Sequence, residues 1–315
     1  MTTEGTPEDR NHVRADSSPD APCWPQRLRI GWCIAGVCVL VFATWSLVDS
    51  SANIRHEELV STIGSLLYGA AMLLMGVMCV RLGGIRHVLY SPRIRSYRHP
   101  EHGTGIVVPG GLTPLTIFMV LLVVAGLGCL AVAALNIYIT DKSELSHGRD
   151  PHATAIFMFV GGVVALIASA VFAWFRLPTT VGLYPQGIER VVRSRKLRRN
   201  NATVQFARWD AIESIIGTDI VTRSGSGDVR TPMIHIHTTG RIPPEARIPH
   251  DEEHTLAIVC TWLIAEPNTL LTLIRRMSER PNDRTLLARE DAAELLRPPP
   301  LRERFRMARH QEASR

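Results

Sequence analysis

The sequence lacks charge over four long stretches. Residues 30–48, 60–80, 115–139 and 153–175 contain no Asp, Glu, Lys, Arg or His. Each stretch is close to the ~20 apolar residues that a helix needs to cross the hydrocarbon core of a bilayer. They exclude an ordinary soluble domain in this part of the chain. They predict an α-helical membrane bundle with four transmembrane helices, arranged as two hairpins.

The same lack of charge bears on transport. Transporters, proton pumps and channels place ionisable groups inside the bilayer, where they bind ions or relay protons. The four stretches hold none, and their most polar candidate is Asn136 near one end of the third stretch. The spans are therefore expected to anchor and pack. A small transporter, or an accessory subunit of a membrane complex, is the alternative.

Signals of catalysis and metal binding are also missing. The six cysteines have no metal-ligand spacing, and the glycine-rich residues 224–227 lack the Lys-Ser/Thr of a phosphate-binding loop. His250 and His254 fit the H-x-x-E-H pattern of some zinc proteases, but they follow a proline-rich stretch and a polar loop is expected. His235 and His237 share one face of an expected strand and are expected to face solvent. The sequence predicts no catalytic residue, no cofactor and no metal.

Basic residues gather on one side of the four stretches. The loop over residues 81–111 and the segment after residue 175 are rich in arginine, whereas residues 49–59 and 141–152 hold more acidic than basic side chains. Short basic loops stay in the cytoplasm. Both termini are therefore predicted to be cytoplasmic, in a multi-pass protein of the plasma membrane. Residues 1–29 are expected to form a disordered tail, and residues 30–176 the membrane domain.

The net charge of +6 indicates lipid rather than nucleic acid. The basic residues crowd next to the spans, where the anionic inner leaflet attracts them. No nucleic-acid partner is expected.

The fourth stretch carries small residues at every fourth position. These are Gly161, Ala165, Ser169 and Ala173. Small side chains at this spacing let helices approach closely. Packing within the bundle is favoured, and a homo-oligomer interface stays open as the alternative.

Residues 177–280 predict a small α+β domain. Short apolar or alternating runs separated by turn residues predict several strands, and residues 256–264 predict a buried one. A helix is expected to open near Pro267 and to end before Pro281. Its apolar stripe must be buried against the sheet. Residues 281–315 are expected to form a further helix and a basic tail.

This part of the chain resembles the pleckstrin-homology-like (PH-like) domains of bacterial membrane proteins. The resemblance rests on Gly182-Leu183-Tyr184 with Gly187-Ile188, on Trp209-Asp210-Ala211-Ile212, and on the helix near residues 265–274. Together with four spans, the chain is similar to actinobacterial membrane proteins. The resemblance implies a curved sheet capped by a helix, and it implies no activity.

One basic run within this domain is the candidate binding site. Its charged residues are Arg193, Arg195, Lys196, Arg198 and Arg199. The resemblance implies a loop between the first strands that meets phosphorylated headgroups, and arginine forks suit phosphate groups. A solvated loop that only enforces topology is the alternative. The sequence thus predicts a non-catalytic membrane protein that binds anionic lipid or a protein partner at the inner face.

Overall fold

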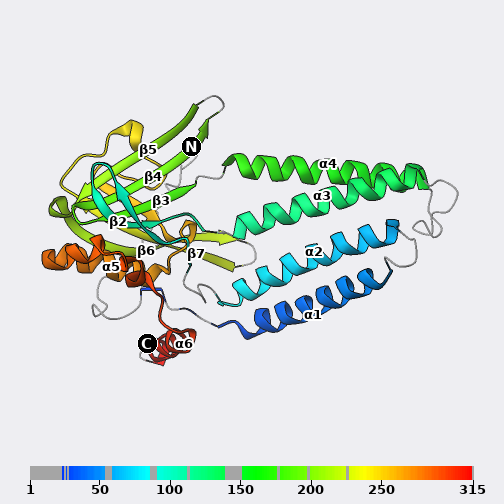
Figure 1. Ribbon diagram of the computed structural model, residues 1–315, viewed down its shortest axis with the longest axis horizontal. Coiled ribbons are helices and arrows are strands. Elements are labelled where there is room, and N and C mark those ends of the chain that lie inside the picture. The colour runs from blue at the N-terminus through cyan, green and yellow to red at the C-terminus, as the bar shows by residue number, and fades with distance from the viewer. Residues whose placement is uncertain are drawn as a thin grey trace, which may run out of the picture.

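The computed structural model describes residues 23, 24, 26, 28–53, 59–85, 91–111, 114–138, 151–175, 178–196, 199–224 and 227–313. Four long helices lie side by side at one end of the molecule, and a domain of strands and short helices lies at the other (Figure 1). We call the second part the sheet domain.

The helices follow the four uncharged stretches. They are α1 (Ile30–Asn53), α2 (Leu59–Leu82), α3 (Pro114–Tyr138) and α4 (Pro151–Phe175). Over the described residues, α1, α3 and α4 are long and apolar enough to cross a membrane, and α2 contributes a shorter apolar stretch, Leu66–Leu82. The chain is a multi-pass membrane protein.

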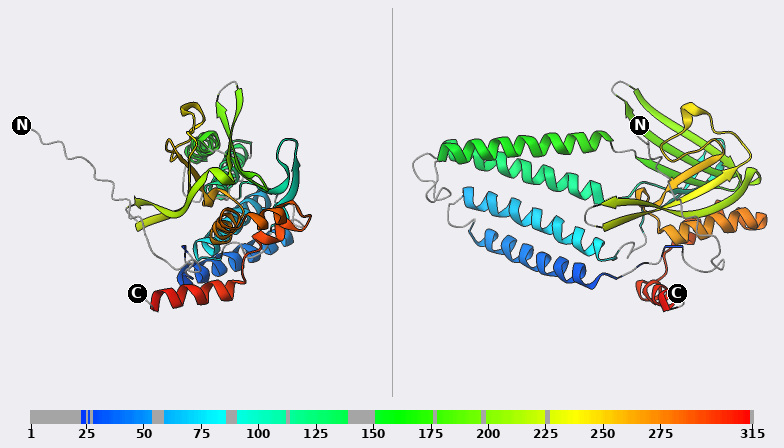
Figure 2. Two further views of the ribbon diagram at one scale, coloured as in Figure 1. Left: turned by 90° about the vertical axis from the view of Figure 1, so that its left-hand side faces the viewer. Right: turned by 180° about the vertical axis from the view of Figure 1, so that it is seen from behind.

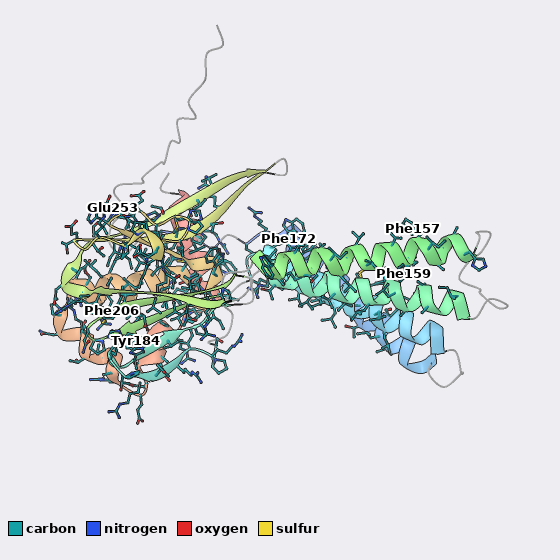
Figure 3. All side chains as sticks on the ribbon, turned by 90° about the horizontal axis from the view of Figure 1, so that it is seen from above. Phe157, Phe159, Phe172, Tyr184, Phe206 and Glu253 are labelled. Carbon is teal, nitrogen blue, oxygen red and sulfur yellow. The ribbon has the colours of Figure 1, made fainter. Side chains whose placement is uncertain are left out.

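The helices form a row in the order α1, α2, α3, α4 (Figures 1 and 2). The closest pairs are α1 with α2 and α3 with α4, as the short connections predict. Large apolar side chains cover the outside of the row, and Phe157 on α4 is 75% exposed. Figure 3 shows Phe157, Phe159 and Phe172 along α4. Apolar side chains on the outside suit a lipid environment.

A five-stranded antiparallel sheet begins earlier in the chain than the sequence indicates. Its strands, in spatial order, are β1 (Arg95–His99), β2 (Gly103–Val108), β3 (Thr179–Tyr184), β4 (Gly187–Lys196) and β5 (Arg199–Arg208). The β1–β2 hairpin comes from the basic segment between α2 and α3, and Ile106 on β2 pairs with Leu183 on β3. The sheet domain therefore extends beyond residues 177–280.

A second antiparallel sheet and a helix complete the core. The strands are β6 (Ile212–Ser224), β7 (Gly227–Thr238) and β8 (Thr255–Val259), and they precede α5 (Pro267–Glu279). Leu270, Ile274 and Met277 on α5 are fully buried in a core shared with both sheets. Trp209 is buried where the chain passes between the sheets, and its indole N–H donates to the Tyr184 carbonyl at 2.8 Å. The stripe of α5 is buried as expected.

The C-terminal region differs from the prediction. The helix expected after Pro281 is replaced by two 3-10 helices, Pro281–Ala288 and Ala292–Leu296. Leu287 and Leu296 are both fully buried. Packing of these side chains onto the core, rather than helical period, sets the path of the chain here. The α-helix comes later, as α6 (Leu301–Ala313).

The segment before α1 is attached to the sheet domain. Trp24 donates its backbone N–H to the Asn268 side chain at 3.0 Å and its indole N–H to the Thr218 carbonyl at 3.2 Å. Gly217 leaves room for the indole, because a Cβ there would lie 3.1 Å from the Trp24 ring. The expected tail of residues 1–29 is therefore ordered at Trp24, and residues 1–22 lie outside the described part of the chain.

Candidate functional site

The predicted basic run is the end of a β-hairpin and not a loop. Strands β4 and β5 pair without interruption from Gly187 opposite Arg208 to Lys196 opposite Arg199. The backbone ladder continues through the charged residues because main-chain hydrogen bonds, rather than side-chain propensity, hold an antiparallel pair. Charge alone did not reveal this strand structure.

The structure describes some residues of the basic run with their side chains and others by their backbone alone. Arg193 is exposed and lies opposite Ala202, and Arg195 lies opposite Asn200. Lys196 and Arg199 are the last described pair of the hairpin. Arg198 lies outside the described residues, as do the side chains of Arg195, Lys196 and Arg199. The pairing of β4 with β5 therefore brings the described members of the run together.

The base of this hairpin is held by a buried ion pair. The Arg190 guanidinium on β4 donates to the two carboxylate oxygens of Asp251 at 2.7 and 2.6 Å. Their side chains are 1% and 0% exposed. Arg190 also donates to the Ala257 carbonyl at 2.5 Å and to the Gln205 side chain. Arg190, which looks in sequence like one more topology charge, is a core residue that joins β4 to β8.

Asp251 is equally well satisfied. Its oxygens accept from the backbone N–H groups of Ile248 and Ala257, both at 2.9 Å. Removing one partner of a buried pair typically costs about 3–5 kcal/mol, because the other charge is left unpaired. The pair therefore gives the β4–β5 hairpin a rigid base. In sequence, Asp251 is hidden within the His-Asp-Glu-Glu-His pattern, and nothing there distinguishes it from its acidic neighbours.

The zinc-protease interpretation of that pattern finds no support in the geometry. Residues 250–254 are not helical, and His250 has a φ of 83°. The two histidines are therefore not one helical turn apart, as such a site needs. Among the described residues, no group of three or more His, Cys, Asp or Glu side chains is placed to hold a metal ion.

The histidines on β7 are partly buried. The ring nitrogen Nδ1 of His237 lies 3.0 Å from the Thr255 hydroxyl, and the rings of His235 and His237 are 6.5 Å apart. Burial lowers the pKa of His235 below its ordinary value, and His237 lowers it further. His235 is thus biased toward its neutral form, and both histidines are half-buried rather than fully exposed.

A stack of rings fastens the β1–β2 hairpin to the main sheet. His102 lies parallel to Phe206 with ring centres 3.9 Å apart, and His99 stacks on its other side at 4.7 Å. Tyr184 donates to the buried Glu189 carboxylate at 3.2 Å. Burial, followed by the charge of Glu189, raises the pKa of Tyr184, so the phenol stays protonated. Figure 3 shows Tyr184 and Phe206 in this part of the domain. The sequence gives no signal for this cluster, because its members come from separate strands.

The expected helix-packing stripe is placed only in part. Ser169 is buried and donates to the Met119 carbonyl on α3 at 3.1 Å, and Ala165 and Ala173 are half-buried. Gly161 has nothing within 4 Å of a Cβ, whereas a Cβ at Gly162 would lie 2.8 Å from the Gly126 carbonyl. At 3.6 residues per turn, a strict four-residue repeat drifts around the helix. It therefore cannot face one neighbour throughout, and Gly162 takes the packing role predicted for Gly161.

The chain has no match in the comparisons with known proteins: no family model, curated protein or solved structure is similar to it.

Proposed function

We propose that this chain is a non-catalytic, four-span protein of the plasma membrane whose sheet domain docks on anionic lipid headgroups through the β4–β5 hairpin. One observation carries the proposal. The basic run lies at the end of a hairpin that extends from the sheet domain toward the nearer ends of the four long helices (Figures 1 and 2). A basic hairpin in this place would meet the headgroup layer beside the spans.

The energetics support docking by this hairpin. Each basic residue near an anionic leaflet contributes about 1 kcal/mol, and arginine forks can bind phosphate oxygens with two hydrogen bonds. The base of the hairpin is already ordered by Arg190 and Asp251. Docking therefore costs little conformational entropy in the strands. Most of the electrostatic attraction then contributes to the affinity for the membrane.

The rest of the membrane arrangement supports the same proposal. We infer that α2 is the fourth span, because it packs along α1 and its sequence from residue 60 to residue 80 is uncharged. The arginine-rich segments adjoin the sheet domain, which supports cytoplasmic termini and a cytoplasmic sheet domain. Two antiparallel sheets followed by α5 also support a PH-like fold.

The structure offers less support for a transporter. The uncharged stretches lack the ionisable groups on which ion and proton pathways depend. In addition, the described helices lie in a row rather than around a central channel (Figure 1). Anchoring is the simpler role for such a layer.

The test is hydrogen exchange of the full-length protein in nanodiscs. Phosphatidylcholine discs are compared with discs that contain about one third phosphatidylglycerol, at low salt. We expect slower exchange over residues 190–204 in the anionic discs, and loss of the difference at high salt because exposed charges are screened. Equal exchange in both kinds of disc would overturn the proposal.

A variant that lacks the basic side chains of the run makes the test specific for the hairpin. Replacing Arg193, Arg195, Lys196, Arg198 and Arg199 with Gln should abolish the difference between discs. Replacing Arg208, Arg230 and Arg241, which are exposed elsewhere on the sheet domain, should leave it. If the two variants behave alike, general charge attraction and not the hairpin is responsible. If exchange over this hairpin slows only when another membrane or cytoplasmic protein is added to the discs, the partner is a protein.

A further inference from the structure

Helix α6 lies across the direction of the long helices. Figure 1 shows α1–α4 from the side and α6 end-on, and the left view of Figure 2 shows α6 along its length. Because α1, α3 and α4 are long and apolar enough to cross a membrane, a helix that runs across them lies along the membrane plane. Helices that rest on a membrane surface have this orientation.

Hydrogen bonds place α6 at the depth of the lipid headgroups. The Arg304 guanidinium donates to the Gln26 side chain at 2.8 Å, and Gln26 donates to the Gly84 carbonyl. Gly84 is the second residue after α2, which ends at Leu82. The headgroup region is about 5–8 Å thick on each side of the hydrocarbon core, and two extended residues span at most about 7 Å. Helix α6 is therefore attached where α1 and α2 meet the headgroups.

A short, stiff connection joins α6 to the core of the sheet domain. Leu296 is fully buried in that core, and residues 298–300 are three prolines. Proline fixes φ, so a run of prolines is an extended spacer with little freedom. The backbone N–H of Arg304 then donates to the Pro300 carbonyl at 3.1 Å and begins the helix. The position of α6 is therefore determined by the core as well as by the segment before α1.

The inner side of α6 faces the rest of the protein. Arg304 and Ala308 are 5% and 4% exposed. Arg304 also lines a cavity of about 330 Å³, together with Trp24 and Glu266. This side of α6 is thus used for attachment, and any partner from outside must bind the opposite side.

The outer side of α6 is basic. Arg302, Arg306 and Arg309 are all exposed, and their spacing of four and three residues places them on one side of the helix. Glu303 is the one acidic residue between residues 301 and 309. Arginine forks bind phosphate oxygens, and an anionic leaflet attracts basic residues at its surface. The outer side therefore has the charge that an anionic membrane surface requires.

We propose that α6 rests on the inner leaflet and that Arg302, Arg306 and Arg309 bind the phosphates of anionic lipids. The inference rests on the proposed function, which makes the sheet domain cytoplasmic and the leaflet its partner, and it adds a second contact. Figures 1 and 2 show α6 and the β4–β5 hairpin on opposite sides of the sheet domain. Two contacts on opposite sides would fix the tilt of the domain on the membrane.

The test is hydrogen exchange over residues 301–313 of the full-length protein in nanodiscs. Phosphatidylcholine discs are compared with discs that contain about one third phosphatidylglycerol, at low salt. We expect at least fivefold slower exchange in the anionic discs, since one basic residue near an anionic leaflet contributes about that factor. Equal exchange in both kinds of disc would overturn the inference. Slower exchange only after another protein is added would overturn it in favour of a protein partner.

Variants of exposed arginines decide whether the outer side of α6 is responsible. Replacing Arg302, Arg306 and Arg309 with Gln should abolish the difference between discs, and Arg306→Gln alone should reduce it about fivefold. Glutamine is a good helix former, so exchange in phosphatidylcholine discs should match that of the unaltered protein. Replacing the exposed Arg208, Arg230 and Arg241 of the sheet domain is the matched control. Equal loss in the control would overturn the inference.

One further variant separates this inference from the proposed function. The variant that lacks the five basic residues of the β4–β5 hairpin should keep slower exchange over residues 301–313 in anionic discs. Loss of that difference would mean that α6 only follows the hairpin to the membrane, and the inference would be wrong. Failure of the hairpin proposal is read separately, over residues 190–204.

Discussion

Large apolar side chains and charged side chains lie in opposite places in the helices and in the sheet domain. In α1–α4 the large apolar side chains face outward, and the helices meet through small residues such as Gly126 and Gly162. In the sheet domain the large apolar side chains are inside, and charges such as Arg190 and Asp251 are buried as a pair. One region is arranged for lipid and the other for water.

This difference indicates which kind of substitution each region should tolerate least. Close helix contact leaves no room for added volume, whereas a buried ion pair cannot lose one of its charges. Substitutions in each region test this contrast, from the largest expected effect to the smallest.

Asp251→Asn should be the most destabilising change. It keeps the shape of the side chain but leaves the buried Arg190 guanidinium without its counter-ion, so we expect a loss of about 3–5 kcal/mol. Pulse proteolysis of the detergent-purified protein in urea measures it. The control is Glu253→Gln, which breaks an exposed pair with Arg241 and should cost less than about 1 kcal/mol. Similar losses in both variants would show that the buried pair contributes no more to stability than the exposed pair.

Gly162→Val should weaken the packing of α3 against α4 by about 1–3 kcal/mol. The new side chain would press on the Gly126 carbonyl, 2.8 Å from the position of a Cβ. Gly161→Val adds the same volume where nothing lies within 4 Å and should be neutral. Thermal unfolding and light scattering in mild detergent measure stability and mass. A change of mass in Gly161→Val alone would reveal a second copy on this face of α4 and would break the contrast with the sheet domain.

Trp24→Ala tests the connection between the two regions. The variant loses the indole contact with Gly217 and the hydrogen bond to the Thr218 carbonyl, so we expect about 1–2 kcal/mol less protection of the segment before α1. Hydrogen exchange over residues 23–29 measures this loss. Trp32→Ala, at an exposed position on α1, should have no such effect. Unchanged exchange in the Trp24 variant would mean that other contacts hold the segment.

The smallest effect concerns pH. The folded-state pKa of His235 lies below its ordinary value because the side chain is buried. On acidification through ~6.5 the unfolded chain gains a proton that the folded chain resists, so stability falls as pH decreases. His235→Gln should flatten this slope between about pH 7 and pH 5.5, whereas His254→Gln, at an exposed position, should not. An unchanged slope in the His235 variant would assign the pH dependence to other groups.

Much of the fold could be predicted because some signals are local. An uncharged stretch of sufficient length specifies a helix in lipid wherever it stands in the chain. The start and end of α5 follow from Pro267 and Pro281. The β1–β2 hairpin could not be predicted in the same way. Strand β1 is largely exposed and arginine-rich, so its residues carry the same signal as a basic loop. Strand β3, which pairs with β2, follows two helices later in the chain.

The candidate site was predictable in composition but not in form. The basic run around Arg193 stands out by charge, whereas its hairpin geometry depends on pairing with β5. The cavity that Trp24, Glu266 and Arg304 line could not be found from sequence, because these residues come from distant segments. The role of Arg190 was likewise hidden, since its burial separates it from the other arginines and burial is a property of the folded chain.

The pairing of β2 with β3 also constrains how the protein can be made. Ribosomes deliver the chain from its N-terminus, so β2 is synthesised with β1 as its neighbour but must wait for α3 and α4 before β3 exists. Until then β2 presents an open edge, which can pair with the wrong strand. Insertion of the second helical hairpin into the membrane is thus a step in folding the sheet, and a fragment that starts after α4 would lack two of its strands.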